Sequence, residues 1–281
     1  MNGSAIFVTP SITVIRPPRG WFNLNLRELW QYRELAYFFV WRDIKVRYKQ
    51  TTIGAVWAIL QPFIAMIVFS VFFGRLAGIP SDGIPYSIFV YSGLLFWNYF
   101  SFGLSHSASS MVENGNVIKK IYFPRLIIPI ASSLTGLVDF LFATLVLIGL
   151  MVYYQYLPHL IVILYIPLLL CMTFLTSMGI GCFLASVNVK YRDVRYALPF
   201  FIQILMFVTP VIYPVSIVAE KYRWLLALNP MSSVIETARG ILFGKAIDQS
   251  QLLISLGMAC ILFIIGIMYF RKTERFFADI I

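Results

Sequence analysis

The chain has few charged side chains for its length. Of its 281 residues only 12% are charged, whereas 60% are apolar. A soluble globular domain is typically about 25% charged and about 45–50% apolar. This shortage of charge excludes a disordered chain, a fibrous repeat and an ordinary soluble enzyme. It predicts a protein that crosses a membrane several times.

Cysteine and histidine are also scarce. The three cysteines, Cys171, Cys182 and Cys260, lie inside apolar runs and form no CxxC pair. Their odd number excludes a complete disulfide framework, and we expect them to be small buried hydrophobic groups. The two histidines, His106 and His159, are far apart in the sequence, so no metal site is expected.

Patterns for ATP use and covalent chemistry are missing too. Residues 240–246 superficially resemble a phosphate-binding loop, but three residues separate the glycines instead of four. An alanine also follows the lysine, where a serine or threonine would hold Mg²⁺. No catalytic triad and no acidic pair of a membrane glycosyltransferase is found. We expect a chain that is not an enzyme and that binds no cofactor of its own.

Long apolar stretches are abundant, and six are candidates for membrane-spanning helices, which need about 20 residues. The fifth is short and contains Pro199 and Pro210. No internal repeat is found, which argues against an inverted-repeat carrier. The prediction is an all-α integral membrane fold with spans at residues 54–73, 86–109, 126–153, 160–187, 196–213 and 252–270.

A basic segment precedes the first span. Its apolar stretch, 35–41, is too short to cross a membrane. Trp41, Ile44 and Tyr48 recur at spacings of three and four, with basic side chains on another face. This pattern predicts an amphipathic helix in the membrane interface. The predicted division is an N-terminal arm, 1–20, a cytoplasmic interface helix region, 21–52, and a six-span transmembrane domain, 53–281.

The basic residues are unevenly distributed between the two sides of the predicted spans. One side holds 17 lysines and arginines and the other holds five. Positive residues favour the cytoplasmic side, so both termini are expected in the cytoplasm. The net charge of +10 then lies where anionic membrane lipids would meet it, and it does not require a nucleic acid partner.

The outer segment between spans five and six, 214–251, has an unusual composition. Residues 217–228 and 231–243 each resemble a short helix, and Asn229 and Pro230 separate them. Trp224 belongs to an apolar stripe on the first of these helices. We favour a re-entrant helical hairpin over the alternative, a helical loop on the surface.

Asp139 is the only acidic residue well inside a predicted span. A carboxylate there is costly, and it suggests a functional role. No second ionisable residue lies deep in another span, so a proton relay or a channel built on buried charges is not supported. A structural role and a place on a substrate pathway both stay open.

Aromatic residues are numerous, with 25 Phe, 16 Tyr and 6 Trp. Several lie in or near the outer halves of spans one and five. Aromatic faces pack well against the C–H faces of sugars, so these residues could line a glycan conduit. The alternative is an interfacial belt or ordinary core packing. The candidate path residues, with Asp139, are Phe69, Phe72, Phe73, Phe207 and Tyr213.

Two inner loops, 112–125 and 188–195, combine charged and apolar side chains. A connecting loop need not carry Ile, Tyr and Phe, so both loops resemble short segments that dock into a cytosolic partner. The alternative is that their basic residues only anchor the chain on the inner side of the membrane.

Five segments follow one another in a recognisable order: 42–51 followed by Gly54, Trp57, Gln61 and Pro62, then 119–125, 188–194, 209–214 and 229–231. Each segment alone is a weak signal, but the ordered set covers nearly the whole chain after residue 25. The set resembles the transmembrane subunit of ABC-2 type polysaccharide exporters, which serve O-antigen, capsule and teichoic acid export.

The resemblance implies a half-transporter in a bacterial inner membrane. Two copies would form the conduit for a lipid-linked polysaccharide, most directly an O-antigen, and two copies of a separate ATPase subunit would bind ATP and Mg²⁺. Residues at the inner side would receive the ATPase stroke, and the outer hairpin would gate the exit. The implied ATPase-coupling residues are Arg42, Lys45, Lys119, Lys120, Tyr122, Tyr191, Arg192 and Asp193, and the implied gate residues are Trp224, Asn229, Pro230 and Arg239.

Overall fold

The computed structural model describes residues 26–49, 54–158, 161–274 and 276–277. Throughout this part of the chain the regular structure is helical and no strand occurs, which confirms the predicted all-α class. The predicted N-terminal arm, 1–20, and His159 lie outside the described residues.

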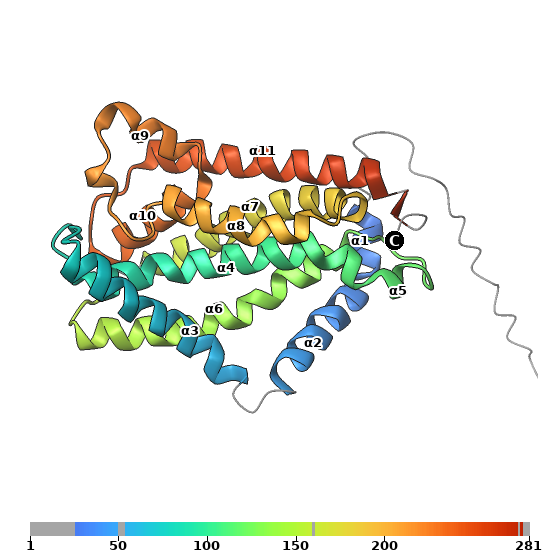
Figure 1. Ribbon diagram of the computed structural model, residues 1–281, viewed down its shortest axis with the longest axis horizontal. Coiled ribbons are helices and arrows are strands. Elements are labelled where there is room, and N and C mark those ends of the chain that lie inside the picture. Colours follow the sequence, from blue (N-terminus) through green and yellow to red (C-terminus); the bar gives the residue numbers. More distant parts are fainter. Residues whose placement is uncertain (1–25, 50–53, 159–160, 275, 278–281) are drawn as a thin grey trace, which may run out of the picture.

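The helices follow the apolar runs of the sequence closely (Figure 1). The four longest are α4, α6, α7 and α11, and the shorter ones join them or cover their ends. In chain order the helices are α1 (Leu26–Gln31), α2 (Arg33–Lys49), α3 (Gly54–Phe69), the π-helix η1 (Ser70–Leu76), α4 (Tyr86–Glu113), α5 (Gly115–Ile118), α6 (Ile127–Tyr153), α7 (Val162–Lys190), α8 (Val194–Val208), the 3₁₀ turn η2 (Val215–Ile217), α9 (Glu220–Ala227), α10 (Pro230–Phe243) and α11 (Gln249–Glu274).

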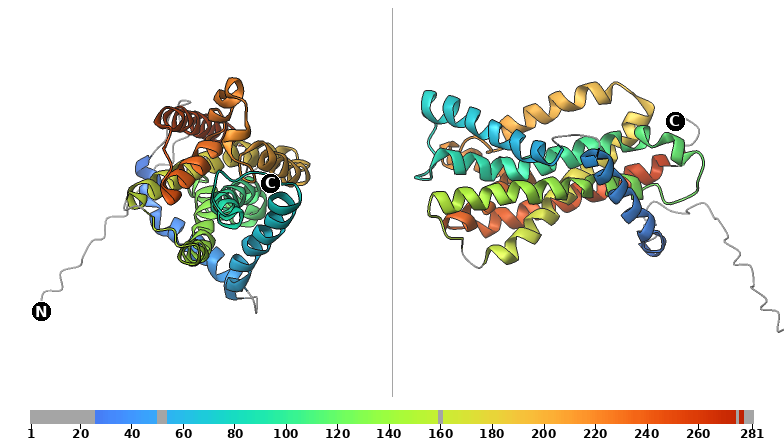
Figure 2. Two further views of the ribbon diagram at one scale, coloured as in Figure 1. Left: turned by 90° about the vertical axis from the view of Figure 1, so that its left-hand side faces the viewer. Right: turned by 90° about the horizontal axis from the view of Figure 1, so that it is seen from below.

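The long helices run side by side along the long axis of the molecule, with α4 near the middle of the bundle (Figures 1 and 2). α4 packs against α6, α7, α3, α8 and α10. This central position explains why a helix with seven serines and three tyrosines is stable here, since most of its polar groups face other helices and not lipid.

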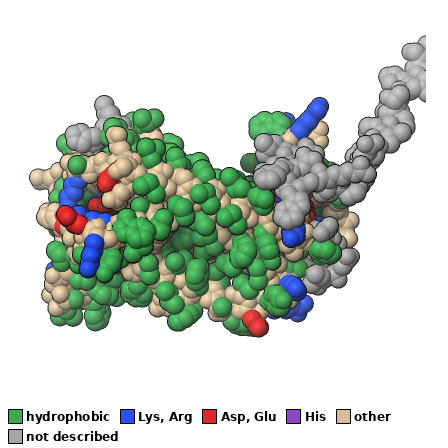
Figure 3. All heavy atoms as spheres, turned by 90° about the horizontal axis from the view of Figure 1, so that it is seen from above, with side chains coloured by type: hydrophobic (Ala, Val, Ile, Leu, Met, Phe, Trp, Pro, Cys, Tyr) green, Lys and Arg blue, Asp and Glu red, His purple; other side chains and the backbone are tan. Residues whose placement is uncertain are grey.

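Four helical segments are long and apolar enough to cross a membrane: Val56–Leu76, Ile127–Tyr153, Val162–Lys190 and Gln249–Glu274. They correspond to predicted spans one, three, four and six. Figure 3 shows the matching surface, with charged side chains toward both ends of this face and hydrophobic side chains between them. Predicted spans two and five are the more polar α4 and the shorter α8, so the six-span count stays a prediction.

Two predicted details need correction. α8 ends at Val208 and not at residue 213, because residues 209–214 leave the helix at a segment bounded by Pro210 and Pro214. The cysteines are also not uniformly buried. Cys182 is buried among the helices, whereas Cys171 is exposed and Cys260 is half-buried.

α7 and α11 approach each other through backbone contact at two glycines. A Cβ atom built on Gly266 would lie 1.8 Å from the carbonyl oxygen of Gly179, and one built on Gly179 would lie 2.6 Å from the Cα of Phe263. Small residues allow this separation, which larger side chains would prevent. The contact joins the last long helix to the bundle.

The outer segment forms two helices, as the sequence predicts. Asn229 caps α10 by accepting a hydrogen bond from the backbone N–H of Met231, and Pro230 occupies the first helical turn. α10 is buried along nearly its whole length against α4, α7 and α11. Of these two helices only α9 is mostly exposed. The alternative, a helical loop on the surface, therefore does not describe α10.

Candidate functional site

A cavity of about 540 Å³ lies where α2 ends and α3 begins, against the middle of α4 and α6. Its lining combines four aromatic rings with a small number of polar groups. The aromatic residues are Trp57, Tyr99, Phe102 and Phe140, and the polar ones are Arg47, Gln61, Asn98, Ser101 and Asp139.

Asp139 is held at one wall of this cavity by two partners from α2. The guanidinium of Arg47 lies 2.6 Å from one carboxylate oxygen, and the hydroxyl of Tyr48 donates a hydrogen bond to the other. Burial, reinforced by the carboxylate, raises the pKa of the Tyr48 phenol, so the hydroxyl keeps its proton and donates. Arg47 also stacks over Phe102, 4.6 Å from the ring centroid.

Sequence reasoning missed this pair. It considered only ionisable residues inside the other spans, and it placed Arg47 and Tyr48 on a helix lying in the membrane interface. α2 packs against α6, with Phe39 buried and Tyr48 turned toward Asp139. Trp41, on the predicted apolar face of α2, is 45% exposed, and the placement of this helix in the membrane interface stays a prediction.

Two side-chain amides line the cavity. The side chains of Gln61 and Asn98 make no hydrogen bond to any residue that the structure describes. Neither amide fills a packing role in the core, since Gln61 is exposed and Asn98 is half-buried. The lining thus offers hydrogen-bonding groups to a molecule inside the cavity.

The other candidate path residues lie away from the cavity. Phe69 and Phe73 pack edge to face with ring centroids 5.7 Å apart and are half-buried, whereas Phe72 is 57% exposed. On α8, Phe207 is 48% exposed. Tyr213, beyond the end of α8, donates a hydrogen bond to the carbonyl of Val208. Of the six candidates only Asp139 lines the cavity.

α3 and α8 lie on the same side of the molecule, flanking α4, in both views of Figure 2. Much of this side is apolar and exposed, including Ile64 on α3 and Phe200 on α8. Gln203 is also exposed on α8, although its neighbours are apolar. The structure therefore brings the predicted spans one and five to one face, as a shared path requires.

Most of the candidate coupling residues lie between α5 and α6 or between α7 and α8, and Arg42 and Lys45 lie on α2. The two connecting segments are at the end of the bundle that carries α1 and α5 (Figure 1). All of these residues are exposed except Arg42, which is half-buried. Its guanidinium bonds to Asp43 and, at 3.0 Å, to the side-chain oxygen of Asn114, so it ties α2 to the start of α5. The exposed members are Lys45, Lys119, Lys120, Tyr122, Tyr191, Arg192 and Asp193.

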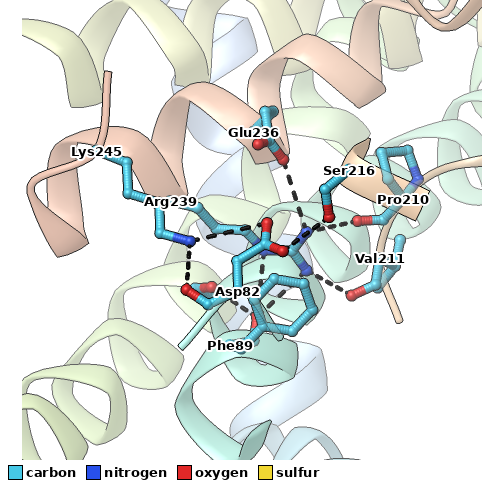
Figure 4. Close-up of polar contacts among 9 residues, drawn as sticks. Asp82, Phe89, Pro210, Val211, Ser216, Glu236, Arg239 and Lys245 are labelled. Carbon is cyan, nitrogen blue, oxygen red and sulfur yellow. Dashed lines mark hydrogen bonds and ion pairs between the residues drawn. The ribbon is translucent and has the colours of Figure 1, made fainter. Parts of the chain in front are cut away.

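At the opposite end, Arg239 on α10 forms the centre of a buried polar cluster (Figure 4). The residue is 2% exposed, and its side chain donates hydrogen bonds to the carbonyls of Phe89, Pro210 and Val211. The guanidinium also lies 3.6 Å from the centroid of the Phe89 ring. A Cβ atom on Gly93 would lie 2.8 Å from it, so this glycine provides its space.

Further contacts join the outer segment to the end of α8 and to Asp82, which lies in the loop before α4. The Asn229 amide donates to the hydroxyl of Thr209 at 2.8 Å. Lys245 donates to the carbonyl of Asp82 at 2.9 Å, and the hydroxyl of Ser216 donates to the Asp82 carboxylate at 2.7 Å (Figure 4). Two of the four candidate gate residues, Asn229 and Arg239, thus hold the turn after α8. Pro230 is buried and Trp224 is exposed on α9.

Comparison with known proteins gives one family and a consistent set of relatives. The family model described as ABC-2 type transporter matches residues 34–243. The O-antigen export system permease protein RfbA of Myxococcus xanthus is 30% identical over 234 residues, which cover 82% of this chain and 88% of that protein. An RfbA of Klebsiella pneumoniae is 26% identical over 240 residues, covering 85% and 92%. The polysialic acid transport protein KpsM of Escherichia coli is 24% identical over 243 residues, covering 83% and 91%.

Proposed function

The chain belongs to the ABC-2 type transporter family, and from this premise we propose that it is the permease subunit of an exporter for a lipid-linked polysaccharide, specifically an O-antigen. The observation that carries the proposal is the similarity to O-antigen export permeases along about nine-tenths of their length. The similarity to a polysialic acid transport protein favours a second candidate, export of a capsular polysaccharide.

The energy for export comes from a separate ATPase subunit in this proposal. The chain lacks a phosphate-binding loop, so ATP and Mg²⁺ belong to the partner. The exposed coupling residues on the two inner loops, with Lys45 on α2, form the surface that two ATPase copies contact. Arg42 holds α2 to the first inner loop, so a push on this loop would move α2 as well.

A second copy of the chain completes the conduit. The exposed side of α3 and α8 is the surface that pairs with it, and Phe72 and Phe207 face the path. Gln203 supports this arrangement, because an amide facing lipid is costly, whereas an amide facing a glycan or a partner helix is not.

The proposed topology has six spans in the bacterial inner membrane and both termini in the cytoplasm. The excess of basic residues at the α1 and α5 end supports this orientation. The segment of α9 and α10 is then a re-entrant hairpin on the outer side. Burial of α10 among the long helices supports that depth, and Arg239 and Asn229 fix the hairpin to the end of α8.

The coupling surface gives the first test. Reversing charge at Lys119 and Arg192, by Lys119→Glu and Arg192→Glu together, should reduce co-purification with the cognate ATPase at least several-fold. Both side chains are exposed at the proposed contact, so their substitution should weaken the contact and leave the fold of the chain intact. ATPase activity of the complex, measured with membranes of equal permease content, should fall in parallel.

Arg75→Glu is the matched control, because Arg75 is exposed at the other end of the molecule. This variant should co-purify like the unmodified chain. Full assembly and full ATPase activity of the double variant would show that the inner loops only anchor the chain. Robust ATP hydrolysis by the purified chain alone would contradict the half-transporter proposal itself.

A further inference from the structure

α2 is attached to the rest of the molecule at two separate places. Its first half packs on the first inner loop, where the ring centroids of Phe39 and Phe123 are 5.8 Å apart. About one turn further along α2, the Arg42 guanidinium donates a hydrogen bond to the side-chain oxygen of Asn114 at 3.0 Å. These contacts bind α2 to the loop that carries the exposed lysines of the proposed coupling surface.

The last turn of α2 is attached to a different element, the middle of α6. The Arg47 guanidinium lies 2.6 Å from one oxygen of the Asp139 carboxylate, and the Tyr48 hydroxyl donates a hydrogen bond to the other. The Tyr48 ring also packs edge to face on Phe142 of α6, with ring centroids 6.1 Å apart. Asp139 lies in the fourth turn of α6, about 18 Å from the start of that helix at about 1.5 Å per residue. α2 therefore joins the first inner loop to a point well inside the bundle.

Neighbouring side chains support the contact with α6. Phe102 of α4 lies against the Arg47 guanidinium, with its ring centroid 4.6 Å away. Gly136, which precedes Asp139 by about one turn, provides the space for this ring, because a Cβ atom there would lie 2.4 Å from it. The His106 ring stacks on Phe102 with centroids 4.0 Å apart. Three helices, α2, α4 and α6, thus meet at one guanidinium.

Stability alone does not account for an ion pair at this place. Apolar side chains of similar size often hold two helices together equally well or better than a buried ion pair, and apolar contacts already hold the first half of α2. A carboxylate inside a span is also costly. An ion pair differs from apolar packing because a guanidinium and a carboxylate meet in a narrow range of geometries. The pair therefore fixes the register of the end of α2 on α6.

We propose that the Arg47–Asp139 pair, supported by Tyr48, is the contact through which α2 passes a movement of the first inner loop to the membrane spans. α3, the first apolar span, begins at Gly54, shortly after α2 ends at Lys49, so the same register also sets the start of that span. Asp139 is then a positioning residue for export and does not touch the glycan. This role rests on the proposed function and adds the contact that links the coupling surface to the spans.

The amount of glycan exported per ATP hydrolysed tests this role, in proteoliposomes that hold the chain, its ATPase and a lipid-linked O-antigen. Asp139→Asn keeps the size of the side chain and removes its charge. It should lower the export per ATP by about five-fold or more, while ATPase activity and co-purification with the ATPase stay close to those of the unmodified complex. Tyr48→Phe keeps the ring against Phe142 and should lower the export per ATP to a smaller extent.

An exchange of the two charges separates a pair from a lone carboxylate. Arg47→Asp combined with Asp139→Arg should recover most of the export per ATP, because the two charges can pair again. A carboxylate that touched the glycan would not be replaced by this exchange. Glu34→Gln is the matched control, since it makes the same chemical change at an exposed position in the first turn of α2. Its export per ATP should equal that of the unmodified complex.

Thermal unfolding and elution volume show whether each variant is folded. Unchanged export per ATP in folded Asp139→Asn would overturn the role of the pair. A joint loss of assembly, ATPase activity and export would also overturn it, because the pair would then only hold the fold. An equal loss of export per ATP in Asp139→Asn and in the exchanged pair would assign the effect to the carboxylate alone. An unmodified complex that hydrolyses ATP and exports no glycan would instead overturn the proposed function.

Discussion

Arg239 shows at the scale of single residues how a buried charge can organise a turn. Its guanidinium satisfies the carbonyls of Phe89, Pro210 and Val211, two of which became available because the chain leaves the helix after Val208. Buried carbonyls without donors are costly. The arginine thus holds together the start of α4, the end of α8 and the middle of α10.

We expect Arg239→Lys to lower the thermal unfolding temperature of the detergent-purified chain. A lysine has a single side-chain nitrogen, which cannot lie within hydrogen-bond distance of the carbonyls of Phe89, Pro210 and Val211 at once. Each carbonyl left unpaired costs about 1–3 kcal/mol. Arg75→Lys, the same substitution at an exposed position, should leave the unfolding temperature unchanged. Equal unfolding temperatures for both variants would show that the cluster does not stabilise the outer segment.

The sequence identified Asp139 and Arg239 as notable residues, but it could not supply their partners. Arg47 and Asp139 lie far apart in the chain, and they meet only because α2 turns back against α6. Sequence periodicity describes one helix at a time and says nothing of such a crossing. The basic character of α2 was the one available signal, since an intramembrane carboxylate calls for a cationic partner.

At the scale of helices, the apolar runs predicted most of the architecture. The third predicted span, 126–153, corresponds to α6, and the break at Asn229 separates α9 from α10 as expected. The predicted end of the fifth span was wrong. Mostly apolar residues continue to Tyr213, but the helix ends at Val208, before Pro210. Burial of α10 could not be predicted, since its composition also suits an exposed helix.

The contact of α7 with α11 gives the prediction at this scale. Gly266→Ala should strongly reduce stability, because the added methyl group would collide with the backbone of Gly179. Thermal unfolding and the yield of monodisperse protein in detergent measure the loss. The methyl group could be accommodated only if α7 and α11 moved apart, which would disturb the packing along their length.

Gly257→Ala provides the comparison on the same helix. A Cβ atom at Gly257 would meet no atom within 4 Å, so the helix-forming preference of alanine should dominate. This variant should be as stable as the unmodified chain or slightly more so. If the two variants unfolded at the same temperature, the glycine contact would not be what joins α7 to α11.

At the scale of the whole molecule, one chain presents three separate surfaces. One end exposes basic and aromatic side chains, which we propose contact the ATPase, and at the opposite end Arg239 and Asn229 fix α10 to the turn after α8. The side of α3 and α8 has an apolar face containing Gln203, which we propose pairs with a second copy. The sequence predicted the need for partners, but the folded arrangement shows which helices share that side (Figure 2).

The most direct measurement is glycan export by proteoliposomes that contain the chain, its cognate ATPase and a lipid-linked O-antigen. With ATP supplied on the side of the ATPase, the account predicts that the labelled glycan becomes accessible to a glycosidase on the opposite side. A nonhydrolysable ATP analogue, or omission of either protein, should abolish this transfer. Glycan transfer that proceeds at the same rate without the permease chain, or no transfer by the complete ATP-hydrolysing complex, would contradict the account.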